Sequence, residues 1–98
     1  MQTITEAEFS QKVLESSETI LVDFYSPTCP PCKMLDSKTF PQVTDLNIVK
    51  IDATEAPTLS SQYKVNAVPT LIFFKDGKEV KRHLGYVEAA TLRKMFEF

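Results

Sequence analysis

The only two cysteines of the 98-residue chain, Cys29 and Cys32, lie in the stretch SPTCPPCKM at positions 26–34. Two thiols at this spacing can form a reversible disulfide, bind a metal or cross-link the fold. The two prolines between them suit the start of a helix, where residues three apart share one face with Cβ atoms about 5 Å apart. Because a disulfide needs about 4 Å between Cβ atoms, the pair can close and reopen with little backbone movement. The stretch therefore predicts a redox-active disulfide.

Metal binding and a structural cross-link are the alternatives for this pair. A structural zinc site needs four ligands, but the chain has one histidine, His83, and no second pair of cysteines at this spacing. A disulfide across so short a loop would remove little entropy from the unfolded chain. A chain of this length also buries a sufficient core without cross-links. We therefore expect redox chemistry and no metal site.

The two cysteines should differ in their roles. Cys29 stands at the helix N-terminus, where backbone amides and the helix dipole favour a thiolate, so it is the expected nucleophile. Cys32 must lose a proton before it can attack a mixed disulfide. Asp23 is the candidate proton acceptor, because it lies in the apolar run 19–25 and burial would raise its pKa. The alternative is an aspartate at a strand end that caps a turn.

The elements that position these residues follow from the pattern along the chain. Thr5-Glu6-Ala7-Glu8 is a capping box, which begins a helix of about ten residues. The run 19–25 is β-branched, aromatic and apolar, as in a strand covered on both faces. Asp76-Gly77 is a strong signal for a hairpin turn. The other expected elements are a short first strand at 1–4, strands at 46–52, 70–75 and 79–84, and helices at 29–38, 56–63 and 88–96.

The order of these elements predicts the fold class. Alternation of helix and strand implies parallel neighbours, whereas the late hairpin adds antiparallel strands. We therefore expect an α/β fold, a three-layer α/β/α sandwich with a mixed central β-sheet. No repeat, low-complexity tract or linker interrupts the sequence, which predicts a single domain over residues 1–98.

The composition excludes several classes of partner. The net charge is −2, with 11 basic and 13 acidic residues dispersed along the chain, so neither nucleic acid nor an anionic membrane is an expected partner. The longest apolar runs fall far short of the roughly 18 residues that a membrane span requires, and the first residues do not predict a signal peptide. We expect a soluble, cytoplasmic monomer. In that reducing compartment a CxxC pair is typically redox-active or metal-binding.

The motifs together resemble the thioredoxin family over nearly the whole chain. They appear in the family's order and spacing: LVDFYS at 21–26, TCPPCKM at 28–34, Ile51-Asp52, VPTL at 68–71, KDGK at 75–78 and the late Gly85. The resemblance implies the thioredoxin fold and a protein-disulfide reductase activity. It also implies that Cys29 is the attacking cysteine, Cys32 the resolving cysteine and Asp23 the family's buried aspartate behind Cys32.

The same resemblance implies how substrates bind and how the protein is recharged. Pro69 matches the family's cis-proline, which faces the cysteine pair. Val68 is then free to pair with an extended substrate segment, which Thr28 and Pro30 flank. The expected partners are protein disulfides and a thioredoxin reductase-like electron donor. The resemblance implies no cofactor besides the redox-active disulfide.

Four positions depart from the family pattern. Pro30-Pro31 replaces the usual Gly-Pro and removes one more N–H donor from the helix start. Thr28 replaces the usual tryptophan. Ser37 replaces a proline that kinks the active-site helix. Ile48 is taken to replace a lysine near the buried aspartate, which would leave Asp23 without a cationic neighbour and harder to ionise.

These features favour a thiol-disulfide oxidoreductase that reduces partner proteins through the Cys29–Cys32 couple. One alternative is a dedicated electron carrier, or a disulfide oxidant or isomerase, for a specific partner. This alternative is raised by the segment 39–43, which is more typical of thioredoxin-like domains with specific partners. Another alternative is a peptide-binding module without redox chemistry, although such a module would be expected to lack the cysteine pair.

Overall fold

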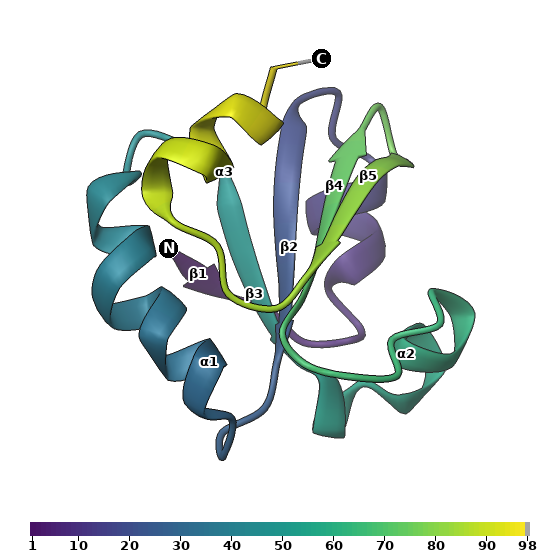
Figure 1. Cartoon of the computed structure of the whole chain (residues 1–98). Coiled ribbons are helices and arrows are strands. Elements are labelled where there is room, and N and C mark those ends of the chain that lie inside the picture. Colours follow the sequence, from purple (N-terminus) through teal and green to yellow (C-terminus); the bar gives the residue numbers. More distant parts are fainter. Residues whose placement is uncertain (98) are drawn as a thin grey trace.

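A mixed sheet forms the centre of the protein in the computed structural model, which describes residues 1–97 (Figure 1). Within these residues the sheet has five strands in the order β1-β3-β2-β4-β5. β1, β3 and β2 are parallel, whereas β4 is antiparallel to β2 and β5 is antiparallel to β4. The strands are β1 (Gln2–Thr3), β2 (Thr19–Tyr25), β3 (Ile48–Asp52), β4 (Thr70–Lys75) and β5 (Lys78–Leu84).

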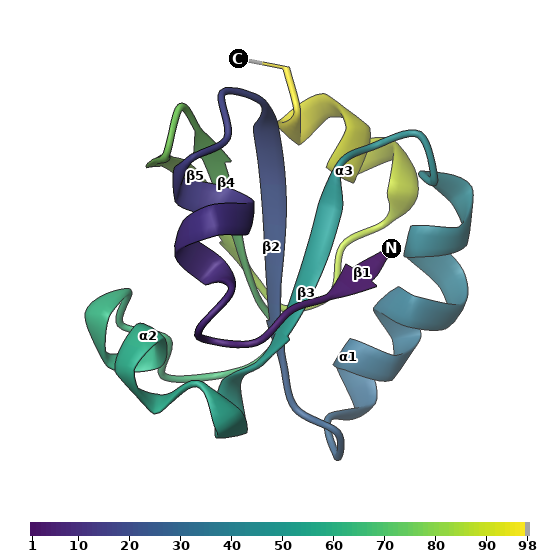
Figure 2. The same cartoon turned by 180° about the vertical axis from the view of Figure 1, so that it is seen from behind.

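Helical segments cover both faces of this sheet. α1 and α3 lie on the face seen in Figure 1, and η1 and α2 lie on the face seen in Figure 2. Each face carries its own cluster of buried apolar side chains, one around Phe9 and Phe24 and the other around Leu35 and Leu92. The arrangement confirms the predicted three-layer α/β/α class. The helical segments are η1 (Ser10–Leu14), α1 (Pro30–Met34), η2 (Leu35–Thr39), η3 (Phe40–Gln42), η4 (Ala53–Glu55), α2 (Pro57–Gln62) and α3 (Ala89–Met95).

The predicted capping box is present at the first helical segment. Thr5 N–H donates to the Glu8 carboxylate at 2.9 Å, and Glu8 N–H donates back to the Thr5 hydroxyl at 3.3 Å. The regular helix that follows is shorter than the predicted ten residues, because the chain first passes through turns and then forms the π-helical segment η1. Phe9 and Val13 are buried against the sheet. Packing of these apolar side chains against the sheet stabilises the helical segment, although the segment is short.

The helix that carries the cysteines extends further than predicted. We expected it to end near residue 38 because of Pro41, but η2 and η3 continue the helical path to Gln42. Pro41 lies in the first turn of η3, where a missing N–H breaks no helical hydrogen bond. Phe40 and Val43 are buried against the sheet. Burial of these side chains on the α1 face therefore favours continuation of the helical path.

The predicted hairpin joins β4 and β5 through Asp76 and Gly77, whose φ angles are 51° and 74°. Two successive positive φ angles are typical of the type I′ turn that suits hairpins. A Cβ on Gly77 would overlap the backbone carbonyl oxygen of Leu14, at the end of η1. Gly77 is thus required both by the turn and by the approach of η1.

The remaining elements agree with the predictions to within about two residues. The strand predicted over 46–52 begins at Ile48, because Leu46 N–H instead closes a turn onto the Val43 carbonyl at 3.0 Å. No helix within residues 1–97 is long and apolar enough to cross a bilayer. The predicted single domain ends at Phe98, which lies outside the described residues.

Candidate active site

Cys29 and Cys32 form a disulfide at the first turn of α1, with their Cα atoms 5.2 Å apart. Cys29 is the N-cap of α1, with extended backbone angles, and its Sγ accepts a hydrogen bond from Cys32 N–H at 3.2 Å. Pro30 and Pro31 occupy the first helical positions and supply no N–H. The amide of Cys32 is therefore the first donor of the helix, and it donates to the sulfur of Cys29.

Both cysteines are buried, and they differ slightly in exposure. Cys29 is 7% exposed and Cys32 is 2% exposed, so Cys29 is the more accessible residue of the two. Thr28 and Pro30, on either side of Cys29, are both exposed. The structure thus has a redox pair in which the slightly more accessible cysteine, Cys29, is flanked by exposed residues.

Asp23 lies at the centre of β2 and is fully buried. Its side chain shares a face of the sheet with Leu21, which packs in the cluster below α1 and α3. Both carboxylate oxygens lack a hydrogen-bond partner among residues 1–97, so Asp23 does not cap a turn. Burial raises the pKa of Asp23 to about 7; the positive charge of Lys50 opposes the shift and the negative charge of Asp36 adds to it. A carboxyl group with a pKa near neutrality can take up and return a proton at physiological pH.

Lys50 is the cationic neighbour of Asp23, and the prediction that Asp23 lacks one is wrong. The register of β2 and β3 places Lys50 directly opposite Asp23. Its Nζ binds both carboxylate oxygens of Asp36 at 2.7 Å and lies 4.3 Å from the centroid of the Tyr25 ring. Ile48, taken from the sequence as the replacement of a lysine, is instead buried in the apolar cluster below α1.

Sequence reasoning missed both Lys50 and Asp36. A signal for Lys50 was available, because it is the one charged residue within the otherwise apolar run 48–51 of a predicted strand. For Asp36 the available signal was its spacing from Cys32: residues four apart on a helix share a face. Neither signal identifies a partner, since the register between two strands is not visible in the sequence.

The segment before β4 lies at the same end of the sheet as the cysteines. Thr70 pairs with Phe24 near the end of β2, and the loop that leads to Cys29 begins at Ser26. The Val68–Pro69 peptide bond is cis, as the resemblance implied. Pro69 is buried and its carbonyl accepts from Gly85 N–H at 2.8 Å, whereas the backbone of Val68 has no hydrogen-bond partner among the described residues.

A shallow groove of about 330 Å³ runs beside Val68. The side chains that line the groove are small, polar or aliphatic, and none of them is charged. They belong to Ser26, Ala53, Thr54, Ser60, Val65, Asn66, Ala67 and Val68. The groove thus lies beside a residue whose backbone has no hydrogen-bond partner among residues 1–97.

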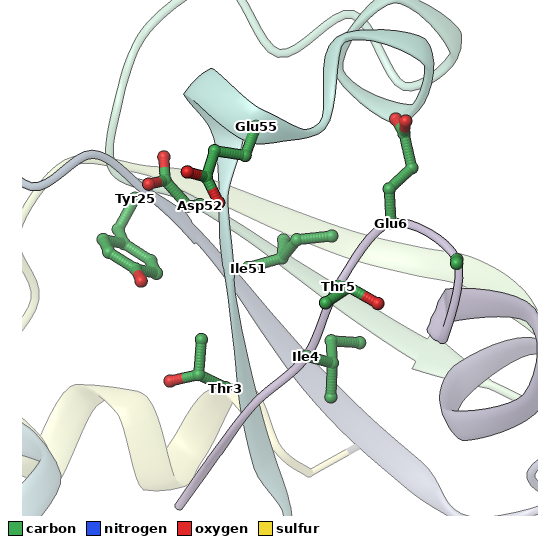
Figure 3. Close-up of a pocket in the computed structure, with 9 residues that line it drawn as sticks. Thr3, Ile4, Thr5, Glu6, Tyr25, Ile51, Asp52 and Glu55 are labelled. Atoms are coloured by element: carbon green, nitrogen blue, oxygen red, sulfur yellow. The ribbon is translucent and has the colours of Figure 1, made fainter.

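A larger hollow of about 430 Å³ lies beside Tyr25 and Asp52 (Figure 3). The Tyr25 ring and three carboxylates surround it, but neither cysteine nor Asp23 contributes to its lining. Two of the carboxylates have structural partners: Glu6 accepts from Leu59 N–H at 2.8 Å, and Asp52 accepts from Thr54 N–H at 2.9 Å. We therefore assign this hollow no part in the redox reaction.

Metal ligands do not gather at any point of residues 1–97: no group of three or more His, Cys, Asp or Glu side chains is placed to hold an ion. His83 is half-buried in β5, and its Nε2 lies 3.3 Å from the carbonyl oxygen of Tyr86.

Comparisons with known proteins match this architecture. The Thioredoxin family model matches residues 1–97. Thioredoxin 1 of Synechococcus elongatus is 42% identical over 93 residues, which cover 91% of this chain and 87% of that protein. Thioredoxin of Mycobacterium bovis is 40% identical over 97 residues, with 94% and 84% covered. Thioredoxin of Chlamydia trachomatis is 37% identical over 101 residues, with 97% and 94% covered.

Proposed function

The chain belongs to the thioredoxin family and is a thiol-disulfide oxidoreductase, and we propose that Cys29 and Cys32 divide its reaction between attack and release. The family resemblance carried by the motifs is thereby confirmed. The observation that carries the proposal is the hydrogen bond from Cys32 N–H to the Sγ of Cys29 at the start of α1.

In the first step the Cys29 thiolate attacks one sulfur of a disulfide in a partner protein. A mixed disulfide forms between Cys29 and that sulfur, and the other substrate sulfur leaves as a thiolate that takes up a proton. The backbone amide of Cys32 and the N-terminal end of α1 favour the thiolate form of Cys29. The greater exposure of Cys29 supports its role as the attacking sulfur.

In the second step Cys32 attacks the Sγ of Cys29 and releases the second substrate sulfur. Cys32 is buried and must first lose its proton, and Asp23 accepts that proton. Asp23 suits this role because its pKa is raised to about 7 by burial. Two electrons have then passed to the substrate, which leaves as a dithiol, while Cys29 and Cys32 remain as a disulfide.

Substrate segments bind as an added strand at Val68, before Pro69. Exposed backbone N–H and C=O groups of one residue can pair with an extended peptide, and the alternate side chains of that peptide then enter flanking grooves. Thr28 and Pro30 border the segment at the cysteine side. The lining without charged residues beside Val68 favours small or neutral side chains in the substrate.

Members of the family act on protein disulfides and are in general reduced by thioredoxin reductase. We extend this to the present chain: a reductase of that kind reopens the Cys29–Cys32 disulfide, and no prosthetic group is required. The dispersed surface charge supports a cytoplasmic monomer that binds neither nucleic acid nor membranes.

A measurement of the redox potential distinguishes two roles. The chain is either a general reductant, or it serves one partner as an electron carrier, an oxidant or an isomerase. A value near the −270 mV of thioredoxin itself favours general reduction, whereas a value at or above about −180 mV favours oxidation or isomerisation. Equilibration with a glutathione buffer series, followed by thiol labelling, measures it.

Trapping of mixed disulfides tests the assignment of the two cysteines. A Cys32→Ser variant should accumulate a covalent complex with a disulfide-bonded protein such as insulin, because the attacking Cys29 remains and the release step is lost. The matched Cys29→Ser variant should accumulate far less. Equal trapping by the two variants would refute the division of roles.

A further inference from the structure

Asp36 binds the ammonium of Lys50 through both of its carboxylate oxygens, each 2.7 Å from Nζ. The Tyr25 ring lies against the same ammonium, 4.3 Å from its centroid. The Lys50 side chain is only 15% exposed, so solvent screens this pair less than a pair on an open surface. These contacts give the ammonium a defined position.

The same lysine has a second carboxylate within its reach. Lys50 stands directly opposite Asp23 on the neighbouring strand, and neighbouring strands are about 4.8 Å apart. A lysine side chain is long enough to turn to either group. Nevertheless, both oxygens of Asp23 lack a hydrogen-bond partner among residues 1–97, whereas Asp36 forms an ion pair with the Lys50 ammonium.

The Asp36–Lys50 ion pair joins the helical layer to the sheet at this point. Cys32 and Asp36 are four residues apart along α1 and η2, and residues at that spacing share a helix face. Asp23 and Lys50 are neighbours across β2 and β3. The helical layer supplies the thiol that must lose a proton and the carboxylate that holds the lysine. The sheet supplies the proton acceptor and the lysine that is held.

We propose that Asp36 is a positioning residue for the release step: it holds Lys50 away from Asp23, so that Asp23 stays a base able to take the proton of Cys32. The proposal rests on the role proposed above for Asp23. Direct pairing with Lys50 would stabilise the Asp23 carboxylate and make it a weaker base. The electrostatics agree in direction, because the charge of Lys50 lowers the pKa of Asp23 and the charge of Asp36 raises it.

The groups that face Asp23 come from four elements of the described chain. β4 presents the uncharged Leu71 directly opposite Asp23. His83 of β5 lies one strand further away, and its ring contacts the Tyr86 carbonyl. The charged or titratable groups that interact with Asp23 are Asp36 from η2, Lys50 from β3 and Tyr25 from β2 itself.

An Asp36→Asn variant tests the proposal. With its partner lost, Lys50 should turn to Asp23 and lower the pKa of Asp23 by about 1 to 3 units, the range found for a carboxyl beside a cation. The acidic limb of the pH profile for mixed-disulfide release should move to lower pH by the same amount. Carboxyl-selective ¹³C NMR of the oxidised protein follows the titration, and rapid-quench measurement of the mixed disulfide follows release.

Controls separate positioning from simple loss of a negative charge. In a Lys50→Met background the Asp36→Asn change should shift the Asp23 titration by a small fraction of its effect in the parent. Asp36→Glu should retain the parent titration, since it can still bind Lys50. Asp45→Asn, which removes an exposed carboxylate paired with Arg93 at 2.8 Å, should leave the titration unchanged.

An equal shift with and without Lys50, or no shift at all, would overturn the proposal. Its failure is distinguishable from failure of the role of Asp23, because the titration of the oxidised protein requires no turnover. That role is tested separately by the release rate of an Asp23→Asn variant.

Discussion

The backbone amide of Cys32 donates to the Sγ of Cys29 at 3.2 Å, across a helix start whose first two positions are prolines. The attacking sulfur therefore has one amide donor within the first turn, where a helix without prolines would offer more. This amide and the slightly greater exposure of Cys29 distinguish the two cysteines, although both lie on one turn of α1.

Limited alkylation of the reduced protein should label Cys29 well before Cys32. Cys29 is the more exposed of the two cysteines, and the helix N-terminus favours its thiolate. At pH 7 and with substoichiometric iodoacetamide, peptide mass spectrometry should find at least about ten times more label on Cys29. Equal labelling, or preference for Cys32, would contradict the assigned roles.

Asp23→Asn should slow release of the mixed disulfide at neutral pH. A thiol of ordinary pKa, about 8.5, is ionised to only a few per cent at pH 7, so loss of the proton acceptor should cost about tenfold or more in rate. The cost should shrink toward pH 9.5, where hydroxide deprotonates Cys32 unaided. Rapid-quench kinetics with release as the slow step measures this. An unchanged rate at pH 7 would mean that the proton leaves Cys32 by another route, such as water.

Asp23 should also make the stability of the oxidised protein depend on pH. Its pKa rises from an ordinary 3.8 to about 7 on folding, so the folded state binds more protons than the unfolded state between these values. The contribution of Asp23 to stability should therefore be greatest below about pH 4 and should fall as the pH rises toward 7, by about 4 kcal/mol at 1.36 kcal/mol per pKa unit.

Denaturant unfolding of the parent and of Asp23→Asn from pH 4 to 8.5 checks this slope. The free energy of unfolding of the variant, minus that of the parent, should increase as the pH rises. The buried asparagine itself does not titrate, so it changes this difference by the same amount at every pH. Asp45→Asn is the matched control, because Arg93 lowers the pKa of Asp45 to about 2 and its titration lies below this range. Parallel curves for the parent and Asp23→Asn would show that Asp23 does not titrate in this window.

A disulfide peptide that pairs with Val68 should lose activity as a substrate when its pairing amide is methylated. N-methylation at the residue opposite Val68 removes the donor that reaches the Val68 carbonyl, which has no partner within the described chain. We expect kcat/KM to fall about tenfold, the equivalent of one hydrogen bond. Methylation of the next residue is the control, since its N–H points away from Val68. Equal effects at the two residues would argue against strand pairing.

The sequence by itself determined the features that depend on neighbours along the chain. The spacing of Cys29 and Cys32 at a helix start predicted their disulfide, because a helical turn brings such residues together wherever the helix lies. The run 19–25 predicted β2, and Asp76-Gly77 predicted the hairpin turn between β4 and β5. The apolar surroundings of Asp23 predicted its burial. In each case the local geometry of a turn, helix or strand limits the outcome.

Only the tertiary structure decided which residues surround Asp23. Lys50 is its neighbour because β2 and β3 pair in one register, and a shift of that register by two residues would bring Ile48 or Asp52 opposite Asp23 instead. That register is set by the packing of both sheet faces, to which distant segments contribute. Asp36 reaches Lys50 because the helix lies across the same face. Contacts between residues 14 or more positions apart depend on how layers pack, and no local pattern in the sequence encodes them.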